Sequence, residues 1–286
     1  MHVARTIDEV RVAVAEARGE SRVVGCVMTM GALHEGHLSL LTAAAEGCDF
    51  CVATVFVNPT QFAPNEDFDA YPRTLDDDLA MCEESGVDCV FVPTDELMYP
   101  HGHATSVLVA GVAEPLEGRH RPGHFAGVAT VVLKLLNIVR PDTAYFGQKD
   151  YQQVAVIRRM VADLNVPVEV AVCPTVREED GLAMSSRNRR LTSEDREAAR
   201  LLSYGITQAL DQLREGQDAE SVRTGLWSVL TADERVTLEY ASVADPESLE
   251  ELDGVVDRAV VAVAARVGTV RLIDNMLFER TSETPS

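Results

Sequence analysis

The stretch that decides the fold reads Met30-Gly31-Ala32-Leu33-His34-Glu35-Gly36-His37. It follows an apolar run, residues 23–28, whose continuous hydrophobicity predicts a buried strand. It leads into Leu38, Leu41 and Ala45, which are spaced like one face of a helix. The sequence therefore predicts a loop that leaves a strand, carries two histidines and opens a helix. In open α/β sheets, ligands bind in the crevice past the carboxyl ends of the strands, so this loop is a candidate site.

The residue types of this loop suit an anionic ligand. Gly31 has no Cβ, so the backbone can approach a ligand closely. The free N–H groups at the start of the following helix favour an anion. His34 and His37 lie three positions apart and are expected on the same side of the first helical turn. A metalloprotease zinc helix needs His-Glu-x-x-His, with the two ligands four apart. An anion site is therefore favoured over zinc and over two histidines that only cap the helix.

Composition argues against several classes of partner. The chain has 286 residues, enough for two domains and a sizeable core. Its net charge of −21 argues against nucleic acid or an anionic membrane as a partner, since both need a basic face. No apolar run approaches the ~18 residues of a membrane span. The first 20 residues lack the apolar core of a signal peptide, so a cytoplasmic protein is expected.

The six cysteines are scattered along the chain at 26, 48, 51, 82, 89 and 173. Most lie in apolar runs, and they are expected to be small buried side chains in a reducing compartment. The lone pair Cys48-x-x-Cys51 is weak evidence for zinc or redox chemistry, because no second pair accompanies it.

Strands alternate with helices from residue 23 to 173, which predicts an α/β fold with a doubly wound parallel sheet. Further strands are predicted at 50–57, 89–92, 106–110, 143–146 and 168–173. Helices are predicted at 6–19, 74–85 and 126–139. Thr74 is the expected N-cap of the second helix, and the carboxylates at 76–78 in its first turn suit the helix dipole better than a magnesium site.

From Thr192 the pattern changes to a smaller α+β unit. Predicted helices at 192–213 and 218–230 are followed by strands at 235–243, 258–267 and 269–276. Gly268 suits a hairpin between the last two strands. We therefore expect a sheet domain at 1–175 and a C-terminal α+β domain at 176–286, with a polar tail after Arg280.

Two other loops follow predicted strands and carry polar side chains. Asn58-Pro59-Thr60-Gln61 follows strand 50–57, and Gln61 offers an amide to a hydroxyl or carboxylate, although Asn-Pro also starts ordinary turns. Gly147-Gln148-Lys149-Asp150 follows strand 143–146. There Gly147 allows close approach, Lys149 can reach a phosphate, and Asp150 can bind ribose or cap the helix. Gln153, one turn further along, is expected to face the same crevice.

Lysine is rare in this chain. Only Lys134 and Lys149 stand among 25 basic residues. A lysine kept in an arginine background indicates a need for a compact ammonium, and the indication is stronger for Lys149, which lies in a loop. Basic residues at 118–125 precede a long helix, where they oppose its dipole and so indicate an anion or a partner. Ser185, Ser186 and Arg187 supply two hydroxyls and a guanidinium, which suits a pyrophosphate.

The first stretch resembles the His-x-Gly-His signature of the nucleotidyltransferase superfamily, whose members attack the α-phosphorus of ATP. Residues 29–37 are more closely similar to the pantothenate synthetase (pantoate–β-alanine ligase) family. The run at 56–62, the pair Glu66-Asp67 and the run at 71–74 match the same family. Met184-Ser185-Ser186-Arg187-Asn188 resembles its version of the Lys-Met-Ser-Lys-Ser loop. Met28 and Gln148 depart from the family pattern, which usually has proline and glutamate there.

The resemblance implies a Rossmann-like sheet domain that binds nucleotide and pantoate, with the α+β domain as a lid. It implies ATP-dependent condensation of pantoate with β-alanine through a pantoyl-adenylate, with Mg²⁺ arriving on ATP and no assigned metal ligand, and a homodimer. The implied catalytic residues are His37, His34 and Lys149. The implied pantoate ligands are Gln61 and Gln153, with Gln61 also at β-alanine. The implied ATP site consists of Met30, Gly31, Ala32, Leu33, His34, Glu35, Gly36, His37, Gly147, Gln148, Lys149, Asp150, Val176, Met184, Ser185, Ser186 and Arg187.

Two other functions fit the same residues. Another nucleotidyltransferase would release the adenylate as its product. A nucleotide-binding sensor on this fold would catalyse nothing, since fold does not fix function. Gln61 and Gln153 favour the ligase over both.

Overall fold

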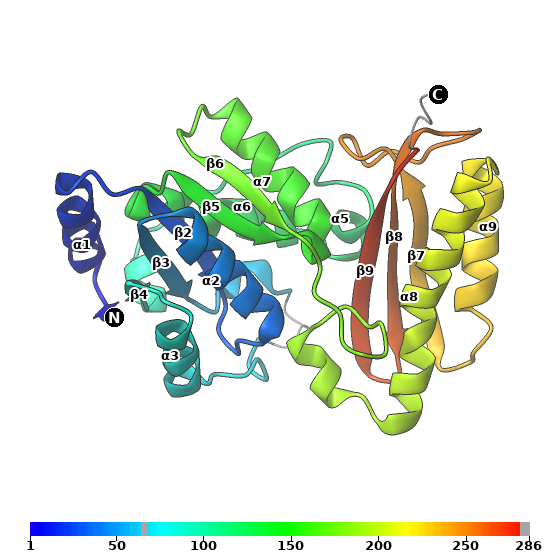
Figure 1. The fold of residues 1–286 in the computed structure, drawn as a ribbon, viewed down its shortest axis with the longest axis horizontal. Helices are drawn as coiled ribbons and strands as arrows, with labels where there is room; N and C mark the ends of the chain where they lie inside the picture. The colour runs from blue at the N-terminus through cyan, green and yellow to red at the C-terminus, as the bar shows by residue number, and fades with distance from the viewer. Residues whose placement is uncertain (64–67, 281–286) are drawn as a thin grey trace. The chain divides into compact units, whose positions relative to one another are not determined.

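The apolar runs of the sequence form a six-stranded parallel sheet in the computed structural model, which describes residues 1–63 and 68–280 (Figure 1). The strand order is β1-β4-β3-β2-β5-β6. The strands are β1 (His2–Ala4), β2 (Val24–Thr29), β3 (Phe50–Val55), β4 (Cys89–Phe91), β5 (Thr143–Gly147) and β6 (Glu169–Cys173). β3 is buried along its whole length, as a parallel strand covered on both faces requires.

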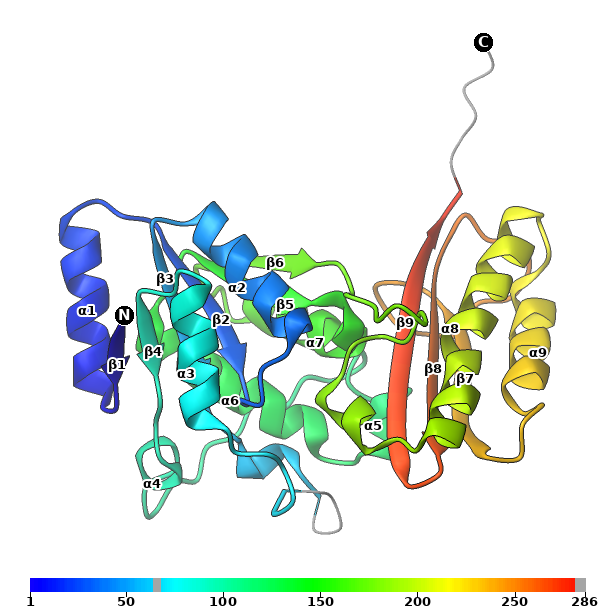
Figure 2. The same cartoon turned by 60° about the horizontal axis from the view of Figure 1, so that its bottom comes forward.

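Helices cover both faces of this sheet, so the predicted doubly wound α/β fold is confirmed. α1 (Ile7–Gly19) and α6 (His124–Val139) contact each other on one face, and α2 (Glu35–Gly47) and α3 (Leu75–Glu84) contact each other on the opposite face (Figure 2). α7 (Tyr151–Asp163) follows β5. Two short helices are α4 (Asp95–Met98) and α5 (Glu117–His120).

The strand order places a topological switch between β2 and β5. The chain runs from β2 through β3 to β4 in one direction, and then continues from β5 to β6 in the other. Loops that leave two such strands diverge and open a crevice at the carboxyl edge of the sheet. The histidine loop follows β2 and Gly147 ends β5, so both lie at this edge.

The second compact unit is a three-stranded antiparallel sheet, β7 (Val236–Ala244), β8 (Arg258–Val267) and β9 (Val270–Glu279). α8 (Ser193–Arg214) and α9 (Ala219–Leu230) pack on it. Gly268 has φ +56 in the two-residue turn between the paired Val267 and Val270, so the predicted hairpin is confirmed. Two short segments, Glu114–His120 and Lys149–Gln152, also belong to this unit. The domain limits 1–175 and 176–286 stay a prediction, because compactness does not show that either part folds alone.

Some expectations were wrong or incomplete. Residues 106–110 form no strand, because the Val107 N–H is taken by Thr130 Oγ1 of α6 instead of a neighbouring strand. Strand β1 was missed, since three residues are too few for a periodic signal. The pair Glu66-Asp67 and the tail after Arg280 lie outside the described residues.

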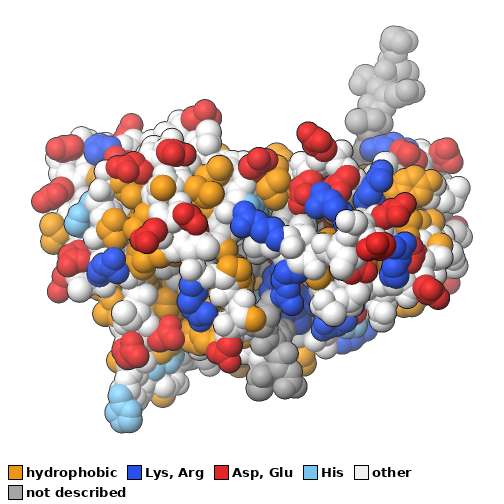
Figure 3. Space-filling view, turned by 90° about the horizontal axis from the view of Figure 1, so that it is seen from below, with side chains coloured by type: hydrophobic (Ala, Val, Ile, Leu, Met, Phe, Trp, Pro, Cys, Tyr) orange, Lys and Arg blue, Asp and Glu red, His pale blue; other side chains and the backbone are white. Residues whose placement is uncertain are grey.

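The surface and the thiols are ordinary for a protein of this composition. Acidic side chains are spread over the face shown in Figure 3. Within the described ranges, no helix has the length and apolar character needed to cross a membrane.

All six cysteines are free, and four are buried. Burial, helped by the charge of Asp88, raises the pKa of Cys51 to about 12, so this thiol is inert near neutral pH.

One glycine fixes how α6 meets the turn after β3. A Cβ at Gly127 would lie 2.3 Å from the carbonyl oxygen of Thr60 and 2.7 Å from Cα of Gln61. Both atoms are backbone, so neither can rotate away. The helix and the 3₁₀ turn η1 (Pro59–Gln61) can therefore approach each other only if residue 127 lacks a side chain.

We predict that Gly127→Ala lowers the free energy of unfolding by about 1–3 kcal/mol, because the added methyl group must displace the turn. Gly225→Ala in α9 is the control, since the nearest atom to its Cβ would be 3.6 Å away. That variant should gain up to about 1 kcal/mol from the helix preference for alanine. Urea unfolding measures both. Equal stability of the two variants would contradict the close contact.

Candidate active site

A buried carboxylate shapes the loop after β2. Gly31 (φ +78) and Ala32 (φ +51) are both left-handed, a conformation that an alanine adopts only when its surroundings enforce it. Asp78 of α3, only 2% exposed, accepts hydrogen bonds from Ala32 N at 3.0 Å and Leu33 N at 2.8 Å. Thr74 Oγ1 donates to the same carboxylate at 3.2 Å. Asp78 therefore holds the strained turn that leads to the histidines.

This role differs from the one expected for the acidic turn of α3. Thr74 occupies the N-cap position, but its side chain makes no cap hydrogen bond and instead donates to Asp78. Asp76 and Asp77 are exposed, as carboxylates that act only on the helix dipole should be. Because Asp78 already binds the N–H groups of Ala32 and Leu33, these two residues would have to contact a nucleotide through other atoms. Met30 and Gly31 line a pocket of about 290 Å³ next to Asp78.

The two histidines meet at the start of α2. His34 is the N-cap, with extended backbone, so it lies just before the first turn and not on it as expected. Its Nδ1 accepts from Gly36 N at 3.1 Å, which leaves the proton of the neutral ring on Nε2. The ring of His37 lies 4.1 Å from that of His34, measured between centroids. The prediction that the two histidine rings face the same side is confirmed.

Gln61 is held in place by its neighbours. It is buried, and its Oε1 accepts from Asn58 Nδ2 at 3.2 Å. Its Nε2 lies 2.9 Å from the sulfur of Met30, so the turn after β3 touches the loop after β2. Asn58 in turn accepts from the Tyr99 hydroxyl at 2.7 Å. Sequence reasoning missed Asn58 and Tyr99 as supports, since an Asn-Pro pair indicates only a turn.

His124, at the start of α6, braces the same turn. Arg121 lies 3.0 Å from His124 Nε2 and is the donor, so Nδ1 of His124 carries the proton. That Nδ1 donates to the main-chain carbonyl of Gln61 at 2.9 Å. The basic stretch at 118–125 was expected to bind an anion or a partner, and that stays a prediction. Part of the stretch also supports Gln61.

The remaining candidates of the sheet unit lie at the end of β5 and on α7. Apart from its two chain neighbours, no described residue lies within 4 Å of the Cβ position at Gly147, so its backbone is open on that side. Gln148 follows it in a 3₁₀ turn. Gln153 is half-buried on α7.

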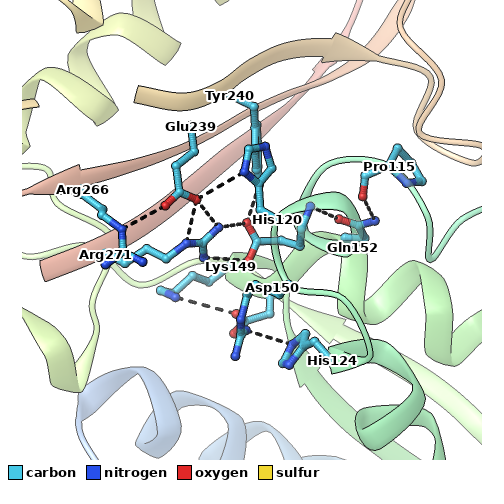
Figure 4. Close-up of polar contacts among 12 residues, drawn as sticks. Pro115, His120, His124, Lys149, Asp150, Gln152, Glu239, Tyr240, Arg266 and Arg271 are labelled. Carbon is cyan, nitrogen blue, oxygen red and sulfur yellow. Dashed lines mark hydrogen bonds and ion pairs between the residues drawn. The ribbon is translucent and has the colours of Figure 1, made fainter. Parts of the chain in front are cut away.

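The second unit holds the other candidates. Lys149 Nζ lies 3.8 Å from Asp150 Oδ1, with side chains 21% and 48% exposed (Figure 4). Ser185 caps the 3₁₀ helix η3 (Ser186–Arg190) by accepting from Arg187 N at 3.3 Å. Met184, Ser185, Ser186 and Arg187 are all half-buried. Lys149 and this short segment are therefore both accessible to a ligand.

Ion pairs hold the base of the segment that carries these serines. Arg196 of α8 donates to Glu178 and, at 2.7 Å, to Asp180. Asn188 donates to Glu178 and to the Ala183 carbonyl. The base of this segment is therefore fixed to the start of α8 within the second unit.

Comparison with known proteins decides the family. A profile described as Pantoate-beta-alanine ligase matches residues 2–277. This chain belongs to that family. The pantothenate synthetase of Acetivibrio thermocellus is 48% identical over 98% of this chain and all of its own length. The crystal structure of pantothenate synthetase from Thermus thermophilus is 45% identical, with a TM-score of 0.92 over 96% of this chain and 99% of that one.

A third relative was solved with ligands. The pantoate–β-alanine ligase of Francisella tularensis, described as complexed with β-γ ATP and β-alanine, is 36% identical. Its TM-score is 0.77, and the match covers 97% of each chain. The family assignment and the fold expected from the resemblance are confirmed. The roles of individual residues in this chain stay predictions.

We predict that Asp78→Asn lowers the free energy of unfolding by about 1–3 kcal/mol, because each carboxylate oxygen faces a buried N–H and the amide can satisfy only one. Hydrogen exchange at the Ala32 or Leu33 amide should speed up. The control is Asp77→Asn, exposed in the same turn and expected within ~0.5 kcal/mol of the parent. Similar losses in both variants would show that Asp78 acts only through its charge on α3.

Proposed function

We propose that this protein condenses (R)-pantoate with β-alanine to pantothenate at the expense of ATP, releasing AMP and pyrophosphate. The observation that carries the proposal is the family match over residues 2–277, a span that includes every candidate residue. The Francisella relative supports it, since its ligands correspond to two of the three proposed substrates.

The chemistry requires activation of the acid. A carboxylate is a poor acyl donor, because oxide would have to leave. In the proposed first step, a carboxylate oxygen of pantoate bonds to the α-phosphorus of ATP, and the bond to pyrophosphate breaks. In the second step, the amine of β-alanine attacks the acyl carbon of the pantoyl-adenylate, AMP leaves and the amine loses a proton. The protein must align the reactants and stabilise charge on the departing group.

The residues proposed to contact the phosphates and pantoate have separate roles. His34 offers an Nε2–H donor, and His37 beside it supplies a second imidazole for the phosphates. Lys149 contributes a compact cation to the same charge. Ser185, Ser186 and Arg187 are proposed to bind pyrophosphate. Gln61, held by Asn58, and Gln153 are proposed to hold pantoate, with Gln61 also near β-alanine.

Mg²⁺ is proposed to enter with ATP. The described ranges contain no group of three or more His, Cys, Asp or Glu side chains arranged to hold a metal ion. Mg²⁺ at nucleotide sites is bound through substrate phosphates, waters and one or two carboxylates, so such a cage is not needed. The ion would neutralise phosphate charge, and no protein ligand is assigned to it.

We also propose a cytoplasmic homodimer. Six free cysteines suit a reducing compartment, and ATP is a substrate. The dimer is carried over from the family alone. Sedimentation equilibrium at micromolar concentration should give twice the mass of the chain; the mass of one chain would refute the dimer.

The order of steps gives a direct test. With pantoate, ATP and Mg²⁺ but no β-alanine, the enzyme should exchange labelled pyrophosphate into ATP, because adenylation is reversible. With carboxylate-labelled pantoate, the complete reaction should transfer oxygen-18 to AMP. Formation of ADP with label in inorganic phosphate would instead indicate an acyl phosphate. A sensor would show neither reaction, and a transferase that stops at the adenylate would exchange pyrophosphate without making pantothenate.

Substitutions of Gln61 and His37 should change different kinetic constants. Gln61→Ala should raise the KM for pantoate far more than the KM for ATP, because its amide is assigned to the acid. His37→Ala should keep ATP affinity and slow single-turnover adenylation by about 10²–10³-fold, as loss of a transition-state donor does. Gln208→Ala is the control, because this half-buried side chain on α8 only donates to the Tyr204 hydroxyl at 2.8 Å, and it should change neither. Equal changes of both Michaelis constants in Gln61→Ala would refute its assignment.

A further inference from the structure

The main chain at Lys149 is held by one buried side chain of β9. Asn275, which is 4% exposed, donates from Nδ2 to the Lys149 carbonyl at 2.8 Å. The two residues are 126 positions apart in the sequence. The main chain of Asn275 is held in the sheet, where it pairs with Ala262 of β8. A buried residue of the edge strand β9 therefore donates a hydrogen bond to the loop that carries a candidate cation.

The preceding residue holds the other candidate loop of this unit. Asp274, 3% exposed, binds Arg177 through two hydrogen bonds of 2.7 and 2.9 Å. Arg177 also donates to the Gly181 carbonyl at 3.0 Å. The Asn275 N–H donates to Asp274 at 2.7 Å. Two adjacent residues of β9 therefore fix the main chain at 149 and the segment that leads to Ser185.

Further contacts anchor the residues after Lys149 but leave its side chain accessible. The Tyr151 hydroxyl donates to the Pro246 carbonyl at 2.8 Å. Gln152 donates to the Pro115 carbonyl at 2.8 Å and accepts from Glu117 N at 2.9 Å (Figure 4). The main chain is fixed at several points, whereas Lys149 Nζ has only the 3.8 Å ion pair with Asp150 among the contacts described above.

We propose that Asn275 is a positioning residue for adenylation and that it acts by fixing the main chain of Lys149. The adjacent Asp274 fixes the segment that begins at Arg177 to the same strand. The inference rests on the proposed function, in which Lys149 contacts phosphate. A lysine has a long flexible stem, so its ammonium can be placed only if the stem starts from a fixed point. A displacement of about 1 Å at a reacting group can cost on the order of 10²-fold in rate.

The test compares the two half-reactions in the complete protein. In Asn275→Ala, single-turnover formation of pantoyl-adenylate should slow by about 10²-fold. Consumption of preformed, enzyme-bound adenylate by β-alanine should keep the parent rate, because that step contains no departing pyrophosphate. Asn275→Asp is the second variant. It keeps the shape of the side chain but presents an acceptor to the Lys149 carbonyl. It should also slow adenylate formation without slowing adenylate consumption.

A double-mutant cycle and a structural control complete the design. If Asn275 acts through Lys149, Asn275→Ala should cost little more in a Lys149→Ala background. Arg280→Ala is the control, because Arg280 follows β9 and donates to the carbonyls of Leu213 and Val256, away from Lys149. Arg280→Ala should lower the Tm without slowing adenylate formation relative to adenylate consumption.

The outcomes are distinct. A parent without pyrophosphate exchange would overturn both the proposed function and this inference. A parent with exchange, combined with an Asn275→Ala variant that adenylates at the parent rate, would overturn only the inference. Equal slowing of both half-reactions, or effects that add fully to those of Lys149→Ala, would reduce Asn275 to a stabilising residue and likewise overturn it.

Discussion

The loop that carries His34 and His37 depends on a single buried carboxylate. Two consecutive left-handed residues are costly, and Ala32 has no intrinsic preference for that conformation. Asp78 compensates by accepting both N–H groups of the turn at once. Gly31 has no alternative, because a Cβ there would lie 2.8 Å from the same carboxylate. The strain and its support come from different elements, so the loop keeps its shape only when α3 is packed against the sheet.

The second unit uses charges in a similar way. Arg271 of β9 binds Glu117 through two hydrogen bonds and Glu239 through one. Burial alone would lower the pKa of Arg271, but the two carboxylates raise it. Burial and then Glu117 raise the pKa of Tyr240, whose hydroxyl donates to Glu117. Breaking this ion-pair cluster should destabilise the fold strongly, because removing one partner leaves a buried charge unpaired. The cluster fixes the 115–117 segment against which Gln152 is bonded.

The scarcity of lysine has a physical interpretation in this structure. Lys134 places its Nζ 5.5 Å from the centroid of the Tyr99 ring, a cation–π contact that explains its retention structurally. Several arginines pair with carboxylates through their planar guanidinium groups, such as Arg177 with Asp274 and Arg196 with Glu178 and Asp180. Lys149 makes no planar pairing, and its ammonium is only loosely paired with Asp150. That contrast favours a phosphate contact for Lys149, as expected from composition.

The sequence by itself determined the fold class, most of the strands and helices, the Gly268 hairpin and the family. Those features are local, because apolar runs, caps and glycine turns are written within a few residues of the structures they form. Only the tertiary structure decided that Asp78 holds the histidine loop, that Gly127 admits the Gln61 turn, that His124 braces it and that Asn275 holds Lys149. The partners in these contacts are 46, 67, 63 and 126 residues apart, respectively. Their meeting depends on the packing of whole elements, and no local pattern in either partner records it. The same reason explains the failed strand at 106–110, where the pattern suited a strand but the hydrogen-bond partner was a threonine on α6.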